Sequence, residues 1–455
     1  MQKNDILTLE VTALSSEGAG IARHDGMVVF VPFSAVGDIA ECRILKVQKS
    51  YAYAKIEHLL KPSEHRIEPD CTVFGRCGGC LLRHITYAEE LRAKEQFVRD
   101  AFMRIGGLDI PVEPIISTGV TERYRNKAQL PVAEIDGRAA CGFYSQRSHR
   151  VIPCDDCKLE PEIFSEISRE IIAYQQKNAL SCYDESSGKG LLRHIYLRRG
   201  HHSGEVMVCL VVTQKTDSYD ALADILKERF PQIVTVLLNV NPEKTNVILG
   251  KRDAPILGDG KIRDSICGVE VEISAHSFYQ VNTAAAELVY RKAAEYALLT
   301  GGETLLDLYC GAGTVGLSMA NGAGRLIGVE VIPEAIENAR ENARRNEVNN
   351  AEFIVGDSGD IAKRLAEKGE RPDVITVDPP RKGCDQKTLD AIVTMSPERV
   401  VMISCNPATA ARDVKYLCER GYRAVKACPA DMFPRTGHVE TIVLLQRETS
   451  GAAFY

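Results

Sequence analysis

The sequence predicts an α/β chain, with a small β-barrel first, a mixed α+β middle region next and a doubly wound parallel sheet last. Three observations support this class. From about Asn282 onward, continuous apolar runs alternate with helical patterns, as in a parallel sheet covered by helices on both faces. Before residue 60 the chain shows short alternating strands separated by glycine turns. Its 455 residues are enough for two or three domains.

The first element in the chain is the barrel, expected over residues 1–60. Its strands are indicated by alternating runs at Ile6–Val11, Gly18–Ala22 and Met27–Pro32. Asp25-Gly26 separates the last two runs and predicts a tight hairpin turn, because both central positions of such a turn favour residues that tolerate positive φ.

Cysteines cluster in the segment that follows. Cys71, Cys77 and Cys80 lie within ten residues, and Cys154 and Cys157 form a second pair that could supply a fourth ligand. The N-terminus has no apolar signal core, so a cytoplasmic protein is expected, in which clustered thiols indicate metal rather than disulfides. Four thiolates suit zinc or an iron–sulfur cluster, and the spacing does not choose between them.

The spacing of apolar residues predicts an amphipathic helix over residues 87–105. Strand runs such as Val206–Val212 and Ile233–Leu238 then indicate a mixed α+β region, and Asn282 should cap a helix over Thr283–Leu299. Parallel strands are expected, in chain order, at Leu305–Leu308, Leu326–Val329, Phe353–Val355, Val374–Val377 and Val400–Ile403. A last strand at Thr441–Leu445 should run antiparallel, because residues 433–439 are too few for a crossover helix.

A glycine loop, Gly311–Gly316, follows the first of these strands and precedes a helix. This context indicates a nucleotide-type cofactor, and on its own the loop could serve NAD, S-adenosylmethionine or a simple tight turn. Asp307 before the loop favours S-adenosylmethionine, which carries a cationic amino-acid end and no pyrophosphate. Glu330 ends the next strand, where a carboxylate can accept hydrogen bonds from both ribose hydroxyls.

Two further motifs end strands on the same side of the predicted sheet. Asp378-Pro379-Pro380 is followed by Arg381, where enzymes that methylate amino groups carry an aromatic residue. Cys405 ends the fifth strand, and Glu440 begins the antiparallel one, so both are expected at one edge. A thiol and a carboxylate so placed can act as nucleophile and base. The alternatives are a buried small hydrophobe and a strand-edge charge.

The formal net charge of −6 gives no general attraction to nucleic acid, so any RNA contact must depend on local patches. Two basic stretches are candidates, although a charged cluster is more often a solvated face. One contains Lys189, Arg193, Arg198 and Arg199, and the other contains Arg123, Arg125 and Lys127. No apolar run approaches the length of a membrane span.

Taken together, the chain resembles the bacterial uracil-5 methyltransferases of 23S ribosomal RNA that carry a 4Fe-4S cluster. The resemblance covers essentially the whole chain. It is carried by the N-terminal barrel, which resembles a TRAM domain, by Cys71, Cys77 and Cys80, and by the segments 278–282, 307–313, 378–383, 404–407 and 431–441.

The resemblance implies that Cys405 is the nucleophile and Glu440 the base. It also implies an iron–sulfur cluster rather than zinc, with Cys157 as fourth ligand, since Cys157 precedes a short apolar stretch as in the family. The residues implied to line the cofactor and target-base site are Gln280, Tyr309, Gly311, Gly313, Thr314, Glu330, Asp357 and Asp378.

Three domains are then expected: a TRAM-like RNA-binding barrel over 1–60, an iron–sulfur domain over 61–92 and 125–270, and a catalytic domain over 93–124 and 271–455. The expected partner is ribosomal RNA, with no DNA, no membrane and a monomeric chain. A transfer-RNA methyltransferase with the same chemistry is the first alternative, disfavoured by the cysteines. A non-catalytic RNA-binding protein is the second, disfavoured by the intact Cys405, Glu440 and glycine loop.

Overall fold

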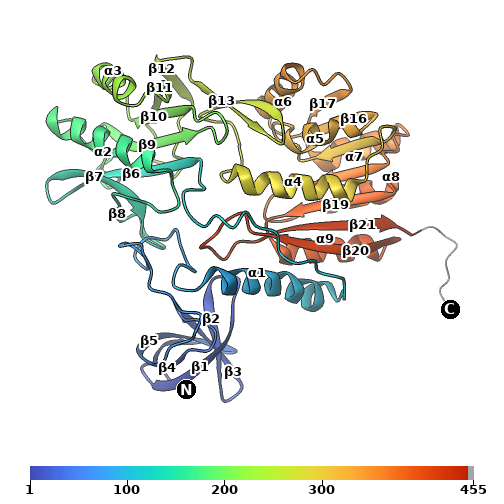
Figure 1. The fold of residues 1–455 in the computed structure, drawn as a ribbon, viewed down its shortest axis with the longest axis horizontal. Helices are drawn as coiled ribbons and strands as arrows, with labels where there is room; N and C mark the ends of the chain where they lie inside the picture. The colour runs from blue at the N-terminus through green and yellow to red at the C-terminus, as the bar shows by residue number, and fades with distance from the viewer. Residues whose placement is uncertain (449–455) are drawn as a thin grey trace.

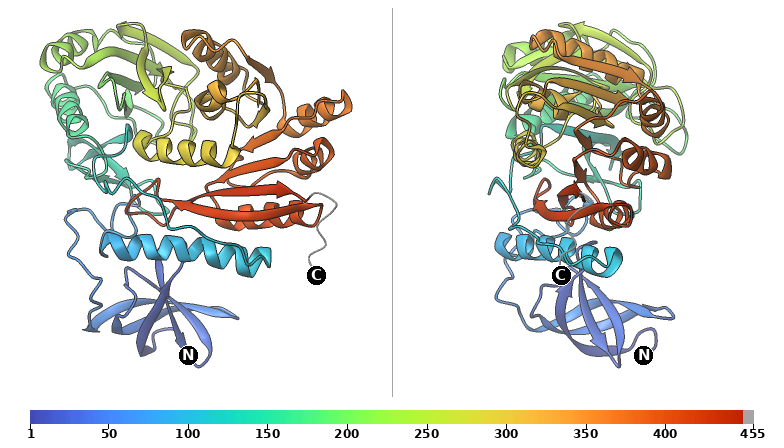
Figure 2. Two further views of the ribbon diagram at one scale, coloured as in Figure 1. Left: turned by 45° about the vertical axis from the view of Figure 1, so that its right-hand side comes forward. Right: turned by 90° about the vertical axis from the view of Figure 1, so that its right-hand side faces the viewer.

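A computed structural model describes residues 1–448, in which helix α1 lies between the N-terminal barrel and the C-terminal sheet (Figure 1). In Figure 1 the central sheet, within residues 127–257, lies to the upper left of the C-terminal sheet. The left-hand view of Figure 2 shows the same arrangement. No helix in these residues is long and apolar enough to cross a bilayer.

The barrel is closed, with strand order β1-β2-β3-β5-β4. Its interior is filled by small and branched apolar side chains such as Ala22, Val29 and Ile44, which are fully buried. Asp25 and Gly26 have φ values of 48° and 79°, which confirms the predicted hairpin turn. The strands are β1 (Ile6–Leu14), β2 (Ala19–His24), β3 (Met27–Pro32), β4 (Ile39–Val47) and β5 (Tyr51–Lys61).

Helix α1 (Tyr87–Ala101) begins at Thr86, whose side chain accepts a hydrogen bond from the Glu89 amide, and continues as a π-helix over Phe102–Gly106. The predicted helix over residues 87–105 is therefore confirmed. Its apolar face, including Val98 and Phe102, belongs to the hydrophobic core beneath the C-terminal sheet.

The central region is a seven-stranded sheet of order β12-β11-β10-β9-β6-β7-β8, in which only β10 and β11 pair in parallel among the described residues. A separate hairpin, β13–β14, links it to the C-terminal domain. The elements are β6 (Lys127–Ile135), β7 (Arg138–Tyr144), β8 (Val151–Pro153), α2 (Glu162–Lys177), β9 (Leu192–Arg199), β10 (Val206–Val212), α3 (Asp220–Arg229), β11 (Ile233–Val240), β12 (Arg252–Leu257), β13 (Lys261–Ile266) and β14 (Val269–Ser274).

Strand β9 corrects one expectation, because it buries most of the first basic stretch. Arg193 and Arg198 are each only 3% exposed. Their guanidinium groups donate hydrogen bonds to backbone carbonyls, those of Asn241 and Glu243 for Arg193 and those of Ser274 and Ser277 for Arg198. The prediction that these arginines contact RNA is therefore wrong: they satisfy loop carbonyls inside the sheet.

The C-terminal sheet has the order β17-β16-β15-β18-β19-β21-β20. Its first five strands are parallel, and β21 pairs antiparallel with β19, as predicted, with Ser404 opposite Thr441. Strand β20 was not predicted, because Arg423 and Lys426 interrupt its apolar run. The strands are β15 (Thr304–Leu308), β16 (Arg325–Glu330), β17 (Ala351–Val355), β18 (Val374–Val377), β19 (Arg399–Ser404), β20 (Tyr422–Ala430) and β21 (Glu440–Arg447).

Helices cover both faces of this sheet, as the doubly wound pattern requires. Helices α4, α5 and α6 contribute to one hydrophobic core, and α1, α7, α8 and α9 contribute to the other. Asn282 caps α4 through its side chain, as predicted. The helices are α4 (Thr283–Ala297), α5 (Thr314–Met319), α6 (Pro333–Arg345), α7 (Ser358–Glu367), α8 (Gln386–Met395) and α9 (Pro407–Cys418), with a 3-10 turn at Ala320–Gly322.

Candidate active site

The predicted site residues follow the carboxyl edge of the C-terminal sheet. Parallel strands present their carboxyl ends on one edge, and the antiparallel β21 begins there. The strand order therefore arranges the residues across the sheet in the sequence Asp357 after β17, Glu330 at the end of β16, Tyr309 after β15, Asp378 after β18, Cys405 after β19 and Glu440 at the start of β21.

Asp307 stabilises the glycine loop through hydrogen bonds of its carboxylate. Its carboxylate is buried and accepts hydrogen bonds from the Gly316 amide at 3.0 Å and from the Thr376 hydroxyl at 2.8 Å. A β-carbon on Gly316 would lie 2.9 Å from that carboxylate oxygen, so only glycine fits this close approach. Burial raises the pKa of Asp307 to about 6, although both hydrogen bonds lower it. Asp307 is therefore a structural support of the loop.

The carboxylates of Glu330 and Asp357 each accept hydrogen bonds from nearby backbone amides. Glu330 accepts from the amides of Gly311 at 3.2 Å and Val331 at 2.8 Å. Asp357 caps helix α7 by accepting from Gly359 and Asp360 at 3.1 and 3.2 Å. Each carboxylate is thereby fixed at the sheet edge, Glu330 beside the glycine loop and Asp357 one strand further out.

The other side chains predicted to bind the cofactor are those of Tyr309, Thr314 and Gln280. Tyr309 has a positive φ of 64°, a strained value for a non-glycine residue, and its hydroxyl lies 3.0 Å from that of Thr388. Thr314, at the start of α5, lies 3.2 Å from the hydroxyl of Tyr290. The side chain of Gln280 interacts with the same Tyr290 hydroxyl, so Gln280 and Thr314 share a neighbour.

Cys405, Glu440 and Asp378 form an electrostatically coupled group. Burial and the neighbouring Asp378 together raise the pKa of Glu440 to about 8. Burial likewise raises the pKa of Asp378 to about 7, with Asp307 adding to the effect. The Cys405 thiol has its pKa raised to about 11 by burial and then by Glu440 and Asp378. Crowded acids of this kind favour binding a cation beside them.

Arg381 is a site residue that the sequence analysis did not assign. Its positive charge lowers the pKa of both Cys405 and Glu440, opposing the effects of burial and of Asp378. Its backbone carbonyl accepts a hydrogen bond from the Asn406 side chain at 3.2 Å, which ties the Pro-Pro turn to the turn after Cys405. The position of Arg381 directly after Asp378-Pro379-Pro380 was the available signal.

The cysteines of the second predicted site converge on one small cavity of about 60 Å³. It is lined by both cysteine groups, Cys71, Cys77, Cys80, Cys154 and Cys157. None forms a disulfide. Within residues 1–448, however, no three histidine, cysteine, aspartate or glutamate side chains are close enough together to bind a single metal ion. The fold therefore gathers the thiols without arranging them around one ion.

Comparison with known proteins gives two matching sequence families. Residues 86–448 match the family described as tRNA (Uracil-5-)-methyltransferase, and residues 2–56 match the TRAM domain. The first match includes the whole sheet edge described above.

Full-length relatives agree with the family match. A protein of Clostridium tetani named "Uncharacterized RNA methyltransferase" is 42% identical over 446 residues, covering 98% of this chain and 97% of the relative. A Bacillus cereus protein of the same name is 41% identical over 449 residues, covering 98% of each. The crystal structure of Pyrococcus abyssi tRNA (uracil-54, C5)-methyltransferase in complex with S-adenosyl-L-homocysteine superimposes with a TM-score of 0.76, at 27% identity, over 96% of this chain and 100% of that one.

Proposed function

Because this chain belongs to the tRNA (uracil-5-)-methyltransferase family and is an S-adenosylmethionine-dependent RNA methyltransferase, we propose that it methylates C5 of a uridine through a covalent bond between Cys405 and C6. The observation that carries the covalent step is the pairing of β19 with β21, where Ser404 lies opposite Thr441. The residues next to that pair, Cys405 and Glu440, consequently share the sheet edge, and Glu440 raises the pKa of Cys405.

The proposed chemistry assigns one task to each residue. C5 of uracil is a poor nucleophile, and addition of the Cys405 thiolate to C6 creates an enolate in which C5 is nucleophilic. S-adenosylmethionine supplies the electrophilic methyl group. After C5 is methylated, Glu440 removes the C5 proton, and the electrons of the broken C–H bond form the C5–C6 double bond and expel Cys405. The uracil must be unstacked to enter this site.

The cofactor would be held along the other half of the edge. Glu330 would accept hydrogen bonds from ribose hydroxyls, and Gly311, Gly313 and Thr314 would bind its amino-acid end. Gln280, Tyr309, Asp357 and Asp378 would complete the site. The acids with raised pKa values beside Cys405 suit a sulfonium cation, because a positive charge there lowers the cost of ionising them.

The proposed substrate is 23S ribosomal RNA, because the cysteine cluster is part of the chain's resemblance to the ribosomal enzymes. Transfer RNA is the second candidate, since the Pyrococcus abyssi enzyme named for tRNA matches the chain along almost its full length. Mass spectrometric mapping of 5-methyluridine in a deletion strain separates the two. A site lost from ribosomal RNA supports the proposal, and a site lost from transfer RNA alone overturns the choice of substrate.

The pKa of Glu440 predicts the pH dependence of turnover. Because its folded pKa is raised to about 8, the base is protonated and inactive below that pH, and ionised above it. We expect the logarithm of the rate at which the methylated Cys405 adduct breaks down to product to rise with pH and level off near pH 8, because this step needs ionised Glu440 but no free Cys405 thiolate. Arg381→Gln should move this break to higher pH, since Arg381 lowers the pKa of Glu440. A break that stays in place would exclude Glu440 as the titrating base.

An iron–sulfur cluster is compatible with the cysteine cavity. All five thiols line the same cavity and are free, which is the donor set that such clusters use. Cys71, Cys77, Cys80 and Cys157 are the proposed ligands.

Anaerobically purified protein is therefore expected to be brown and to contain about four irons per chain, the content of a [4Fe–4S] cluster. Iron and sulfide assays check this, and zinc without sulfide would contradict it. Cys157→Ser should lose the iron while Cys154→Ser keeps it. The reverse result would make Cys154 the fourth ligand.

We propose that RNA binds at the tip of the β7–β8 hairpin and not at the buried arginines of β9. Arg76, Arg147 and Arg150 are exposed, and no ion pair to a carboxylate joins any of them within residues 1–448. Arg76 and Arg150 line a cavity of about 910 Å³ together with Tyr144 and His149, whose rings are 5.1 Å apart. Exposed arginines beside aromatic rings suit single-stranded RNA, whose bases stack on such rings.

Replacing Arg76, Arg147 and Arg150 with glutamine should weaken RNA binding and flatten its salt dependence. Each lost phosphate contact removes roughly 0.7 from the slope of log affinity against log salt for a single strand. Replacing Arg104, Arg229 and Arg291, which are paired with carboxylates, changes the net charge equally and should leave the slope unchanged. Equal slopes in the two triple variants would show that the hairpin tip does not contact RNA.

The proposed domains combine these parts: the barrel over 1–60 and the cysteine-bearing domain over 61–92 and 125–270 would bind RNA, and 93–124 with 271–455 would carry the reaction. The assignment of residues from 93 onward to the catalytic domain is supported by Val98 and Phe102, which pack in the core of the C-terminal sheet.

A further inference from the structure

The loop that connects β20 to β21, residues 431–439, ends directly before Glu440 and is held by distant parts of the chain. Asn282 donates a hydrogen bond to the Met432 carbonyl at 3.0 Å, and Tyr124 donates one to the Pro434 carbonyl at 2.9 Å. Gly437 packs against the barrel so closely that an added β-carbon would lie 2.4 Å from the Ser16 carbonyl oxygen. Besides these distant contacts, the connection, here named the base loop, has local hydrogen bonds such as that from the Thr436 hydroxyl to the Phe433 carbonyl at 2.7 Å.

Helix α1 holds the base loop through a buried group of charges. Lys94 donates to the carboxylates of Glu90 and Asp431, each at 2.7 Å, and to the Phe433 carbonyl at 3.1 Å. The side chains of Lys94, Glu90 and Asp431 are fully buried. Asp431 also accepts from the Tyr87 hydroxyl at 2.8 Å. Lys94 therefore joins two elements more than three hundred residues apart in the sequence.

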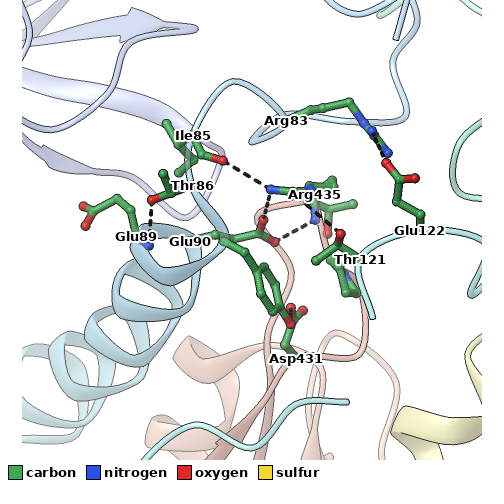
Figure 3. A network of polar contacts seen from close by, with 12 residues as sticks. Arg83, Ile85, Thr86, Glu89, Glu90, Thr121, Glu122, Asp431 and Arg435 are labelled. Atoms are coloured by element: carbon green, nitrogen blue, oxygen red, sulfur yellow. Dashed lines mark hydrogen bonds and ion pairs between the residues drawn. The ribbon is translucent and has the colours of Figure 1, made fainter. Parts of the chain in front are cut away.

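The cysteine-rich segment holds the same loop from the other side. The amides of Leu81 and Leu82, directly after Cys80, donate to the Arg435 carbonyl at 2.9 and 3.1 Å. The Arg435 amide donates to Glu90 at 2.7 Å, and its guanidinium donates to the Ile85 carbonyl at 3.2 Å (Figure 3). Arg435 is thus the point at which the α1 charges and the cysteine segment meet.

A buried ion group of this kind contributes little net stability, because desolvation offsets its attraction. Its well-supported use is to select one geometry among several. The geometry to be selected here is that of the base loop, which contains no helix or strand. Glu440 follows this loop directly and must reach the C5 proton of the target base. A misplacement of about 1 Å can cost about a hundredfold in rate.

We propose that Lys94 and Glu90 are positioning residues for Glu440, and that the segment at Cys80 is the second anchor of the base loop. This proposal rests on the function proposed above. Loss of either anchor lets the loop move, so that Cys405 still adds to the uracil and methyl transfer still occurs, but removal of the C5 proton is slowed. The cysteine segment would thereby support a catalytic step.

The kinetic test uses Lys94→Met and the charge-compensated pair Lys94→Met with Asp431→Asn. The pair leaves Glu90 beside Arg435, 3.6 Å away, and avoids an unpaired buried carboxylate at Asp431. We expect kcat to fall by about tenfold to a hundredfold, with S-adenosylmethionine affinity unchanged. A protein–RNA adduct should accumulate on denaturing gels, as with Glu440→Gln. Global damage would instead reduce cofactor binding and adduct together.

Hydrogen exchange on the protein without RNA gives a second readout. The Arg435 amide should exchange faster in Lys94→Met, which removes one anchor of the base loop. It should also exchange faster in Cys80→Ser, which removes a proposed cluster ligand directly before the Leu81 and Leu82 amides that form the other anchor. Arg104→Met is the matched control, since Arg104 belongs to an exposed pair in the π-helical turn that continues α1. It should change neither the exchange nor kcat.

Wild-type kcat in the folded compensated pair, slow turnover without adduct, or unchanged Arg435 exchange in both anchor variants would each overturn the proposal. These outcomes differ from failure of the proposed function. If the wild-type protein makes no 5-methyluridine, or if Glu440→Gln traps no adduct, the covalent mechanism fails. If Glu440→Gln traps the adduct but the Lys94 variant behaves like the wild type, only the positioning role is refuted.

Discussion

Replacing Cys405 with alanine is expected to abolish methyl transfer, with a loss on the order of 10⁴-fold or more, as when an essential nucleophile is removed. Without the Cys405 thiolate no adduct forms at C6, so C5 of the uracil is not activated. Binding of S-adenosylmethionine should be unaffected, because the glycine loop follows β15, two strands from β19, and Glu330 ends β16, three strands away. Methylation of labelled RNA and calorimetric titration of the cofactor measure the two effects.

Cys418→Ala is the matched control for that substitution. Cys418 is half-buried, like Cys405, but it ends helix α9, away from the carboxyl edge. It should retain normal turnover. Methylation by Cys405→Ala at a normal rate would exclude the covalent mechanism, and loss of cofactor binding would show that the cysteine supports the fold instead.

Replacing Glu440 with glutamine should trap a covalent adduct between the protein and its RNA. Methyl transfer precedes removal of the C5 proton, so without the base the C5–C6 double bond cannot re-form and Cys405 stays bonded to C6. Glutamine keeps the size of the side chain and removes its basicity. We expect a retarded band of labelled RNA on a denaturing gel, and multiple turnover reduced by about a hundredfold or more, in the range of general-base catalysis.

The control for this variant is Glu398→Gln. Glu398 precedes β19 and therefore lies at the opposite edge of the sheet. It should give no adduct and normal turnover. Wild-type turnover without adduct in Glu440→Gln would show that another group removes the proton.

Several elements followed from local pattern alone. The apolar strands of the C-terminal sheet were predictable because a strand buried on both faces leaves a continuous apolar run. The antiparallel direction of β21 followed from a connection too short for a crossover helix. The hairpin at Asp25 and Gly26 and the cap at Asn282 depend on residue chemistry within a few positions, so they were also predicted correctly.

The local sequence pattern led to a wrong prediction about the role of two basic residues. Arg193 and Arg198 lie in a basic stretch, and only the tertiary structure shows that their charges are buried against backbone carbonyls of loops about fifty to eighty residues away. Arg381 is the converse case, because its effect on Cys405 and Glu440 depends on three strand ends meeting at one edge. Long-range pairing of this kind leaves no signature in the residues beside it.

The sequence by itself determined the class of fold, the order of the strands along the chain and the residue types offered for methyl transfer, because periodicity and strand-end motifs are local properties. Only the tertiary structure decided which of these residues lie together. It assembled five cysteines from two segments around one cavity, and it joined Lys94 of α1 to Asp431 of the base loop. Such contacts arise from packing between elements, and packing depends on the whole chain.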